Sequence, residues 1–246
     1  MDRRFIHLSF GLIICTAIAA GAWMNVRLHE TTSIDVRGSA KRRIASDFAE
    51  WEAVVSSAKK TRVEAYSALK TDIESVRAFL KTNGVPEKEI RVSAAELNEL
   101  SHEESTVVGD KVLEKKVFDG WQASQHVDVS SNDVPRVERL SREATQLLEN
   151  GIAITSEPPH YHYTKAGDLK IEMLSEAAHD ARTRAERMID SAGGGAKVGH
   201  IETIDTGVVN INAANSTNTS WEGNYDTSSF EKDIITTVRV RFSVRY

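Results

Sequence analysis

The chain ends with Val238-Arg239-Val240-Arg241-Phe242-Ser243-Val244-Arg245-Tyr246, in which apolar and polar residues alternate without a break. Successive side chains of a β-strand point to opposite faces, so this alternation predicts a strand that is buried on one face only. Such a strand belongs to a sheet with helices on one side and a polar surface on the other. The stretch therefore favours an antiparallel sheet that helices cover on a single face.

The polar face of this strand carries Arg239, Arg241 and Arg245. Opposite charges on neighbouring strands attract modestly, and we expect these arginines to pair with Glu50 and Glu52. The alternative is that they bind anionic lipid or a protein partner.

Six further segments have the composition and alternation of strands. They are residues 31–39, 47–57, 89–100, 117–129, 152–163 and 200–210. We expect the first two to pair with each other. The third and fourth form a second expected antiparallel pair, joined by a charged connection at 101–116.

Three segments have the periodicity of amphipathic helices. The first begins at Thr61 and ends at Gly84, the second begins at Asn132 or Asp133 and ends at Gly151, and the third begins at Asp168 and ends at Gly193. The first opens with a T-x-x-E capping box and has an apolar stripe of Val63, Tyr66, Leu69, Ile73, Val76 and Leu80. The third has a narrow stripe that suits close packing on a sheet, made of Ile171, Leu174, Ala177, Ala178, Ala181, Ala185, Met188 and Ile189.

In chain order these elements read ββαββαβαββ. The sequence thus predicts an α+β protein in which about three helices pack on one face of an antiparallel sheet, preceded by an N-terminal transmembrane helix.

The transmembrane helix is expected at residues 5–24, which carry no formal charge and follow Arg3 and Arg4. Twenty helical residues span about 30 Å, the thickness of the hydrocarbon core of a bilayer. The positive-inside rule then keeps residues 1–4 in the cytoplasm and exports the remainder, with 25–32 as a linker. The alternative is a cleaved secretory signal, because small residues at Ala17 and Ala19 offer a cleavage site.

Composition narrows the possible functions. The net charge of −5 is mild and spread out, which argues against nucleic acid as a partner. The chain has one cysteine, so an intrachain disulfide is impossible. Residues 212–231 are rich in Asn, Ser, Thr and Gly, and we interpret them as a mobile polar loop in preference to a binding lid.

His160 and His162 are the most notable candidates for a chemical site. On a strand they would project from the same face about 7 Å apart, which could suit two metal ligands. No third ligand is evident, although His126, His179 and His200 exist, and an aromatic surface cluster is the alternative. The chain has no nucleophile-elbow, zinc-protease or Walker motif, and Gly193–Gly195 follow a helix where a phosphate loop would precede one. We therefore expect no catalytic, cofactor or metal residue, and no enzyme activity.

Motifs along residues 33–246 resemble the SIMPL-domain family, also called DUF541, in its membrane-anchored bacterial branch. The residues that carry the resemblance are Val36-Arg37-Gly38-Ser39-Ala40, Ala45-Ser46-Asp47-Phe48-Ala49-Glu50-Trp51, Phe79-Leu80, Gly84-Val85, Glu89-Ile90-Arg91-Val92-Ser93, Tyr163-Thr164-Lys165, Ile171-Glu172-Met173-Leu174-Ser175-Glu176-Ala177, Ala181-Arg182, Ala185-Glu186 and Lys197-Val198-Gly199. The resemblance implies an envelope or secreted protein, with ring-like oligomers and tolerance of oxidative stress in some members. It supplies no catalytic residue.

The expected function is that of a non-enzymatic protein anchored in the bacterial inner membrane by one helix, with its C-terminal domain in the periplasm. Its expected partners are the membrane, further copies of itself and possible protein partners. The alternative is a metal- or ligand-binding envelope module that uses His160 and His162.

Overall fold

The computed structural model describes residues 16, 18, 20, 21, 32–108, 111–218 and 220–246. The expected membrane anchor at 5–24 lies almost entirely outside the described residues. Within the described part of the chain, no helix is both long enough and apolar enough to cross a bilayer.

From residue 32 onward the structure is a mixed α/β protein with antiparallel strand pairing, and its helices are α2 (Arg62–Thr82), α3 (Val134–Glu143) and α4 (Ala166–Ala192). The strands are β1 (Ser33–Ala45), β2 (Phe48–Lys59), β3 (Ile90–Val92), β4 (Glu96–Val108), β5 (Lys111–Ser131), β6 (Ala153–Ser156), β7 (His160–His162), β8 (Lys197–Ala213) and β9 (Glu231–Arg245). Short 3₁₀ helices lie at η1 (Glu87–Glu89) and η2 (Ala144–Asn150). The order differs from the predicted one because 89–100 and 152–163 each divide into two strands.

The expectation of one sheet was wrong, because the strands form two sheets. One has three strands in the order β1-β9-β8, and the other contains β3, β5, β2 and β6 with β4 and β7 attached to it. The described residues also divide into two compact units, whose boundaries fall inside β1, α4, β8 and β9. The terminal unit contains residues up to Ala40, Ile171–Val208 and Thr236–Tyr246, and the central unit contains Lys41–Lys170 and Val209–Ile235.

The expected pairing of the first two strands was wrong for a local reason. Between them the chain passes from one sheet to the other at Ser46 and Asp47. The amide of Ser46 donates to Phe230 O, whereas the amide of Asp47 donates to His162 O. These two consecutive amides thus have different partners, one directly before β9 and one in β7. As a result β1 and β2 continue in different sheets.

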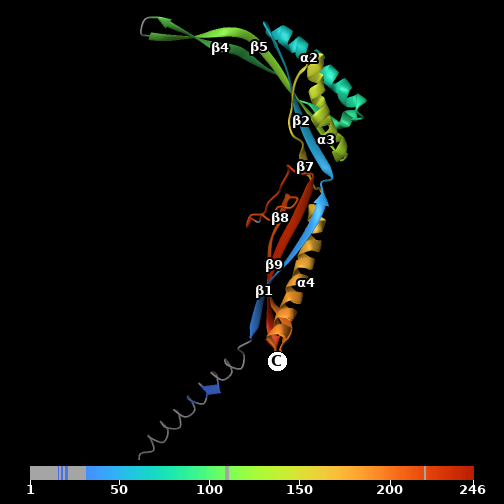
Figure 1. Ribbon diagram of the computed structural model, residues 1–246, viewed down its shortest axis with the longest axis vertical. Coiled ribbons are helices and arrows are strands. Elements are labelled where there is room, and N and C mark those ends of the chain that lie inside the picture. The colour runs from blue at the N-terminus through green and yellow to red at the C-terminus, as the bar shows by residue number, and fades with distance from the viewer. Residues whose placement is uncertain (1–15, 17, 19, 22–31, 109–110, 219) are drawn as a thin grey trace, which may run out of the picture. The chain divides into compact units, whose positions relative to one another are not determined.

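The core of the central unit lies between its sheet and α2 with α3 (Figure 1). Ala49, Trp51, Ala53 and Val55 of β2 point into it, as the alternation in the sequence predicted. Fully buried Val127 and Val129 of β5 lie directly opposite Ala53 and Trp51. Burial of aliphatic and aromatic side chains of this size contributes about 1.5–3 kcal/mol each.

Helix α2 begins at the predicted cap, with the Thr61 hydroxyl oxygen accepting from the amide of Glu64 at 3.3 Å. It ends at Asn83, and Gly84 follows with a φ of +81°, a conformation that favours glycine. The buried stripe is Ala65, Leu69, Ile73, Val76 and Leu80. Val63 and Tyr66 are exposed, because small Ala65 faces the sheet in the first turn.

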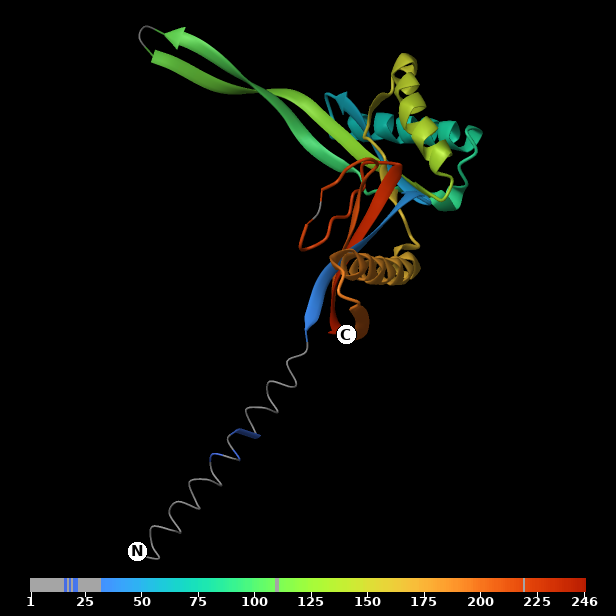
Figure 2. The same cartoon turned by 60° about the horizontal axis from the view of Figure 1, so that its bottom comes forward.

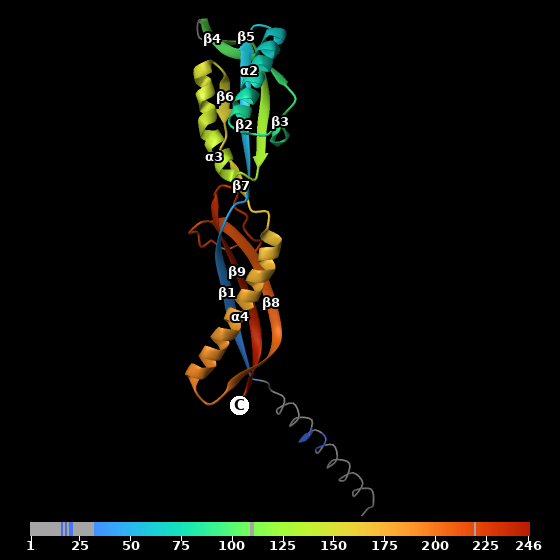
Figure 3. The same ribbon diagram turned by 90° about the vertical axis from the view of Figure 1, so that its right-hand side faces the viewer.

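In the terminal unit α4 lies over the strands β1, β9 and β8 (Figure 3). Its buried residues recur at steps of four and are Leu169, Met173, Ala177, Ala181, Ala185 and Ile189. Ile171 and Met188, predicted to be buried, are exposed. Gly38 of β1 allows the backbone of α4 to approach closely at this stripe, because a Cβ at residue 38 would lie 2.0 Å from Ala177 O and 2.4 Å from Ala181 N. Only the alanine face of α4 permits such close contact between backbones.

Candidate functional site

Among the described residues, three surfaces of the molecule have an unusual composition or a strand edge without a neighbour. The first is the polar face of the central sheet, on the side away from α2 and α3. There Glu52 of β2 lies directly opposite Asp128 of β5, and Arg91 of β3 lies opposite Asp128 from the other side. Like charges at directly paired positions are unfavourable. The fold therefore keeps the carboxylates of Glu52 and Asp128 close together although they repel each other.

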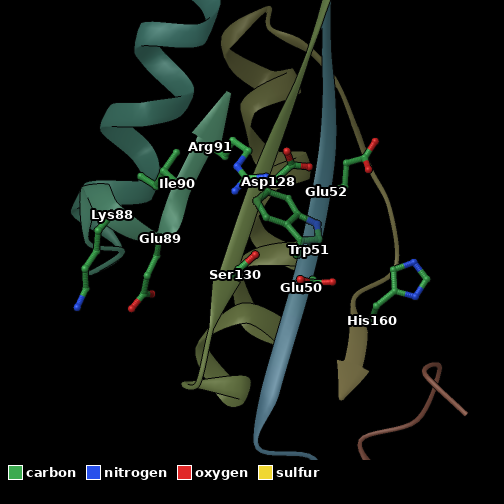
Figure 4. Close-up of a pocket in the computed structure, with 10 residues that line it drawn as sticks. All are labelled: Glu50, Trp51, Glu52, Lys88, Glu89, Ile90, Arg91, Asp128, Ser130 and His160. Carbon is green, nitrogen blue, oxygen red and sulfur yellow. The ribbon is translucent and has the colours of Figure 1, made fainter. Parts of the chain in front are cut away.

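A cavity of about 510 Å³ opens on this face (Figure 4). The residues that line it are Glu50, Trp51, Glu52, Lys88, Glu89, Ile90, Arg91, Asp128, Ser130 and His160. Four carboxylates and two cations line the cavity. Its chemistry is that of a polar, mildly acidic cleft that attracts cationic groups.

Two titrating groups beside this cavity are perturbed. His126 Nδ1 lies 2.5 Å from Glu52 Oε1, and this hydrogen bond raises the pKa of His126. Burial, together with the negative charge of Glu52, raises the pKa of Asp128. The sequence pointed to His126 only as one of three further histidines near no evident site, and it did not point to Asp128. Glu52 lies opposite Asp128 because of the register between β2 and β5, and composition alone does not predict that register.

The two candidate histidines do share the polar face of β7, but they have different surroundings. His160 is exposed at the rim of the cavity, opposite Glu50. His162 lies 6.1 Å from Phe48 and 6.3 Å from Tyr225 between ring centroids, and its Nε2 is 3.4 Å from Glu50 Oε2. This is the aromatic arrangement that stood as the alternative to a metal pair. In the described part of the chain, no three His, Cys, Asp or Glu residues are placed to hold a metal ion.

Of the other three histidines named from the sequence, two have side-chain partners of their own. His126 bonds Glu52, as described, and the Ser243 hydroxyl lies 3.0 Å from His200 Nδ1. His179 is exposed on α4. The structure therefore gathers none of them around His160 and His162.

The second surface is a two-stranded ribbon, which we call the arm. It comprises 100–108 of β4 and 111–120 of β5, because β2 pairs with β5 only from Trp121 onward. In Figure 2 these green strands run away from the helices of their own unit. The prediction of a charged connection at 101–116 was wrong, because residues 101–108 and 111–116 pair as strands. The dipeptide Gly109-Asp110 was the available signal of a hairpin turn.

Specific contacts fix the base of the arm. Gly120 has a φ of +150°, and a Cβ there would lie 2.5 Å from Lys59 O. Lys60 Nζ donates to Asp119 O at 2.9 Å, and His102 Nδ1 lies 2.7 Å from Asp119 Oδ2. Beside them the Arg62 guanidinium lies 3.8 Å above the Trp121 ring. The base is thus closely defined, although Phe118 beside it is 50 % exposed.

The third surface is the outer edge of β8 in the terminal unit. Because β9 pairs with one side of β8, the other side of residues 197–208 has no neighbouring strand among the described residues. Ile201 and Ile204 are 52 % and 51 % exposed there. An edge with free backbone groups and exposed branched side chains is a template for a further strand.

The polar segment at 212–231 is tied to its surroundings by hydrogen bonds. Ile211 of β8 donates its amide to Asn224 O and accepts from the amide of Asp226. Lys232, fully buried, donates to Asp226 O at 2.6 Å and to its Oδ2 at 3.1 Å. Burial opposes ionisation of Asp226, but the bonds from Ser228 and Lys232 lower its pKa to about 2. Mobility of this segment stays a prediction, and its hydrogen bonds define one conformation.

The expected partners of the arginine face were wrong. Arg239 makes two hydrogen bonds with the Asp35 carboxylate at 2.8 and 2.7 Å, and Arg241 makes one at 3.2 Å. Asp35 belongs to β1, which is beside β9, whereas Glu50 and Glu52 belong to the other sheet. The principle of cross-strand charge pairing was correct, and the neighbouring strand was misidentified.

Comparison with known proteins gives one assignment. The sequence model of the family SIMPL, described as "Protein of unknown function (DUF541)", matches residues 34–246. The comparison with curated proteins found no match.

Proposed function

The chain belongs to the SIMPL (DUF541) family, and from this premise we propose that it is a non-enzymatic protein of the bacterial envelope that works by assembling with copies of itself. In this proposal residues 5–24 form a single uncleaved helix in the inner membrane, and the SIMPL domain lies in the periplasm. The observation that carries self-assembly is the presence of an unsupported arm and an open strand edge on the same chain.

Physical chemistry supports this reading of the two surfaces. A two-stranded ribbon alone is marginally stable in water and gains stability from a third strand or a packed face. An open edge that exposes isoleucine carries a risk of aggregation unless a specific partner covers it. A chain that keeps both features has a use for both.

Light scattering on the full chain in detergent tests self-assembly. After the mass of the detergent is subtracted, we expect a particle several times the 27.2 kDa of one chain. Residues 30–246 without the membrane segment provide a second sample in plain buffer. A strict monomer at micromolar concentration in both samples would contradict the proposal.

The topology is tested by reporters fused after Tyr246. Alkaline phosphatase, which is active outside the cytoplasm, is expected to be active, and a cytoplasmic fluorescent reporter is expected to be dark. The reverse pattern would overturn the periplasmic location. A role in oxidative stress predicts that a deletion strain is more sensitive to peroxide than its complemented parent.

A further inference from the structure

We propose that the arm of one copy adds as an outer strand to the open edge of β8 in a second copy, through its β5 side. The inference rests on the self-assembly proposed above and names the two surfaces that would join. Its occupant is a second copy because, among the described residues, each chain carries both a strand ribbon without a third strand and a β8 edge without an outer strand.

The open edge has a definite set of available backbone groups. His200 donates its amide to the hydroxyl oxygen of Ser243 in β9 at 3.1 Å, so this amide points toward β9. Ile211 exchanges both of its backbone groups with Asn224 and Asp226 on the outer side. Alternate residues of a strand face opposite sides, and both observations agree that odd-numbered residues face outward. The groups available to an added strand are therefore those of Ile201, Thr203, Asp205 and Gly207.

The other edge of the same sheet is unsuitable as the acceptor. There the amide of Ser39 in β1 already donates to Asp180 Oδ2 of α4 at 2.8 Å. A charged acceptor makes this a strong hydrogen bond. A strand arriving at β1 would have to displace it, whereas β8 offers its groups without such a cost.

Charge selects which strand of the arm meets β8. Residues 200–208 contain Glu202 and Asp205 and no lysine or arginine. Arg239 acts electrostatically on Asp205, but its guanidinium is hydrogen-bonded to Asp35. The edge therefore presents a negative segment.

On the arm, exposed Lys115 and Lys116 belong to β5, and exposed Glu103 and Glu104 belong to β4 directly opposite them. Glu114 reduces the positive charge of β5 and does not cancel it. Opposite charges on adjacent strands are favourable and like charges are unfavourable. The β5 side of the arm thus fits the acidic edge, and the β4 side would repel it.

The join is heterologous, because arm and edge are different surfaces. Every copy then donates once and accepts once, and the assembly closes into a ring or extends as a filament according to the rotation between copies. Removal of either surface prevents growth at one end of every copy. This makes the inference testable by charge exchange.

The experiment compares full-length variants in detergent by light scattering, with circular dichroism as the check on folding. We expect Lys115→Glu with Lys116→Glu to weaken self-association at least tenfold. Glu202→Lys with Asp205→Lys is expected to do the same. The variant with all four changes is expected to recover most of the parental association, since each new charge meets its opposite.

A backbone test complements the charges. Thr203→Pro removes an outward amide and leaves the hydrogen bonds to β9 in place, so it is expected to block assembly in a folded chain. Thr203→Ala keeps the amide and is expected to assemble as the parent does.

The possible failures are distinguishable. If the parent assembles and both charge-reversed pairs and Thr203→Pro assemble equally well, the arm and edge do not join and the inference is overturned while self-assembly stands. If both charge-reversed pairs are folded but the four-change variant stays dissociated, the charge pairing is overturned. If the parent is itself monomeric, the proposed function fails first.

Discussion

The two outer strands of the three-stranded sheet differ in how they meet solvent. On β1 the side chain of Asp180 takes the amide of Ser39, and Gly38 lets α4 approach within contact of the strand. On β8 the outer side of residues 197–208 has no neighbouring strand within the described chain. The same sheet thus has one closed edge and one open edge.

The difference between the two edges indicates where a partner strand can bind. Natural proteins usually protect sheet edges, so an edge left open beside a protected one marks the side that is used. Four substitutions test this difference between the edges.

Gly38→Val is expected to be the most damaging change. Its side chain would overlap Ala177 O and Ala181 N, so α4 must move away from β1 and the closed edge opens. We expect a loss of about 4 kcal/mol in the free energy of unfolding, measured by urea titration. Gly167→Ala in the first turn of α4 meets no atom within 4 Å and is the control, with equal or slightly higher stability expected. Equal stability of both variants would show that close contact does not hold the helix.

Asp226→Ala is expected to destabilise by about 3 kcal/mol, because it leaves the ammonium of buried Lys232 without its carboxylate. The pKa of Asp226 is lowered from 3.8 to about 2, so its contribution is complete above about pH 4 and is lost as the pH falls toward 2. The parent is expected to lose stability over that window, and the variant is expected to lose less.

Urea titrations at pH 7, 4 and 2.5 measure this difference, with exposed Glu222→Ala as the control. An equal loss of stability in parent and variant would show that Asp226 does not cause the loss of stability at low pH. This result concerns the difference between the two edges, because Asp226 hydrogen-bonds β8 at Ile211, just beyond the open residues 197–208.

Asp180→Asn tests the closed edge alone. It replaces a carboxylate acceptor with a neutral one and removes the ion pair with Arg184, for an expected loss of about 1 kcal/mol. Hydrogen exchange of the Ser39 amide is expected to accelerate, while Glu186→Gln, which affects only a surface pair with Arg182, leaves it unchanged. Unchanged exchange in Asp180→Asn would mean that something other than this carboxylate protects β1.

Arg239→Gln is expected to have the smallest effect on the free energy of unfolding, and a still weaker one in high salt, because its pair with Asp35 is exposed. Arg241→Gln is expected to cost less, since it makes one longer bond. Urea titrations at two ionic strengths compare the variants. A large salt-independent loss for Arg239 would indicate burial that the present geometry lacks.

Much of the secondary structure was predictable because the cues are local. The cap at Thr61 and the glycines after the helices act within a few residues, and the alternation of Val238, Val240 and Phe242 was reproduced as a buried face. Sheet membership was not predictable in this way. It depends on the divergent amides of Ser46 and Asp47, whose partners are more than 100 residues away along the chain.

The candidate surfaces were predicted less well, for the same physical reason. His160 and His162 share a face as expected. The aromatic neighbours of His162 are Phe48 and Tyr225, and only the tertiary structure brings them together. The arm was missed because charged residues suggested a loop, although strands exposed on both faces need no apolar alternation. Exposure of an edge is likewise a property of strand order and leaves no mark in the local sequence.

The glycine at the base of the arm has a consequence for how this protein could change over time. The close contact between Gly120 and Lys59 fixes the direction in which the arm leaves the sheet, and this contact does not depend on the length of the arm. Adding two residues to each strand lengthens its reach by about 7 Å and keeps every side chain on its former side. Adding one residue to each would reverse the sides. Related chains could thus span different gaps between neighbours while keeping the same junction.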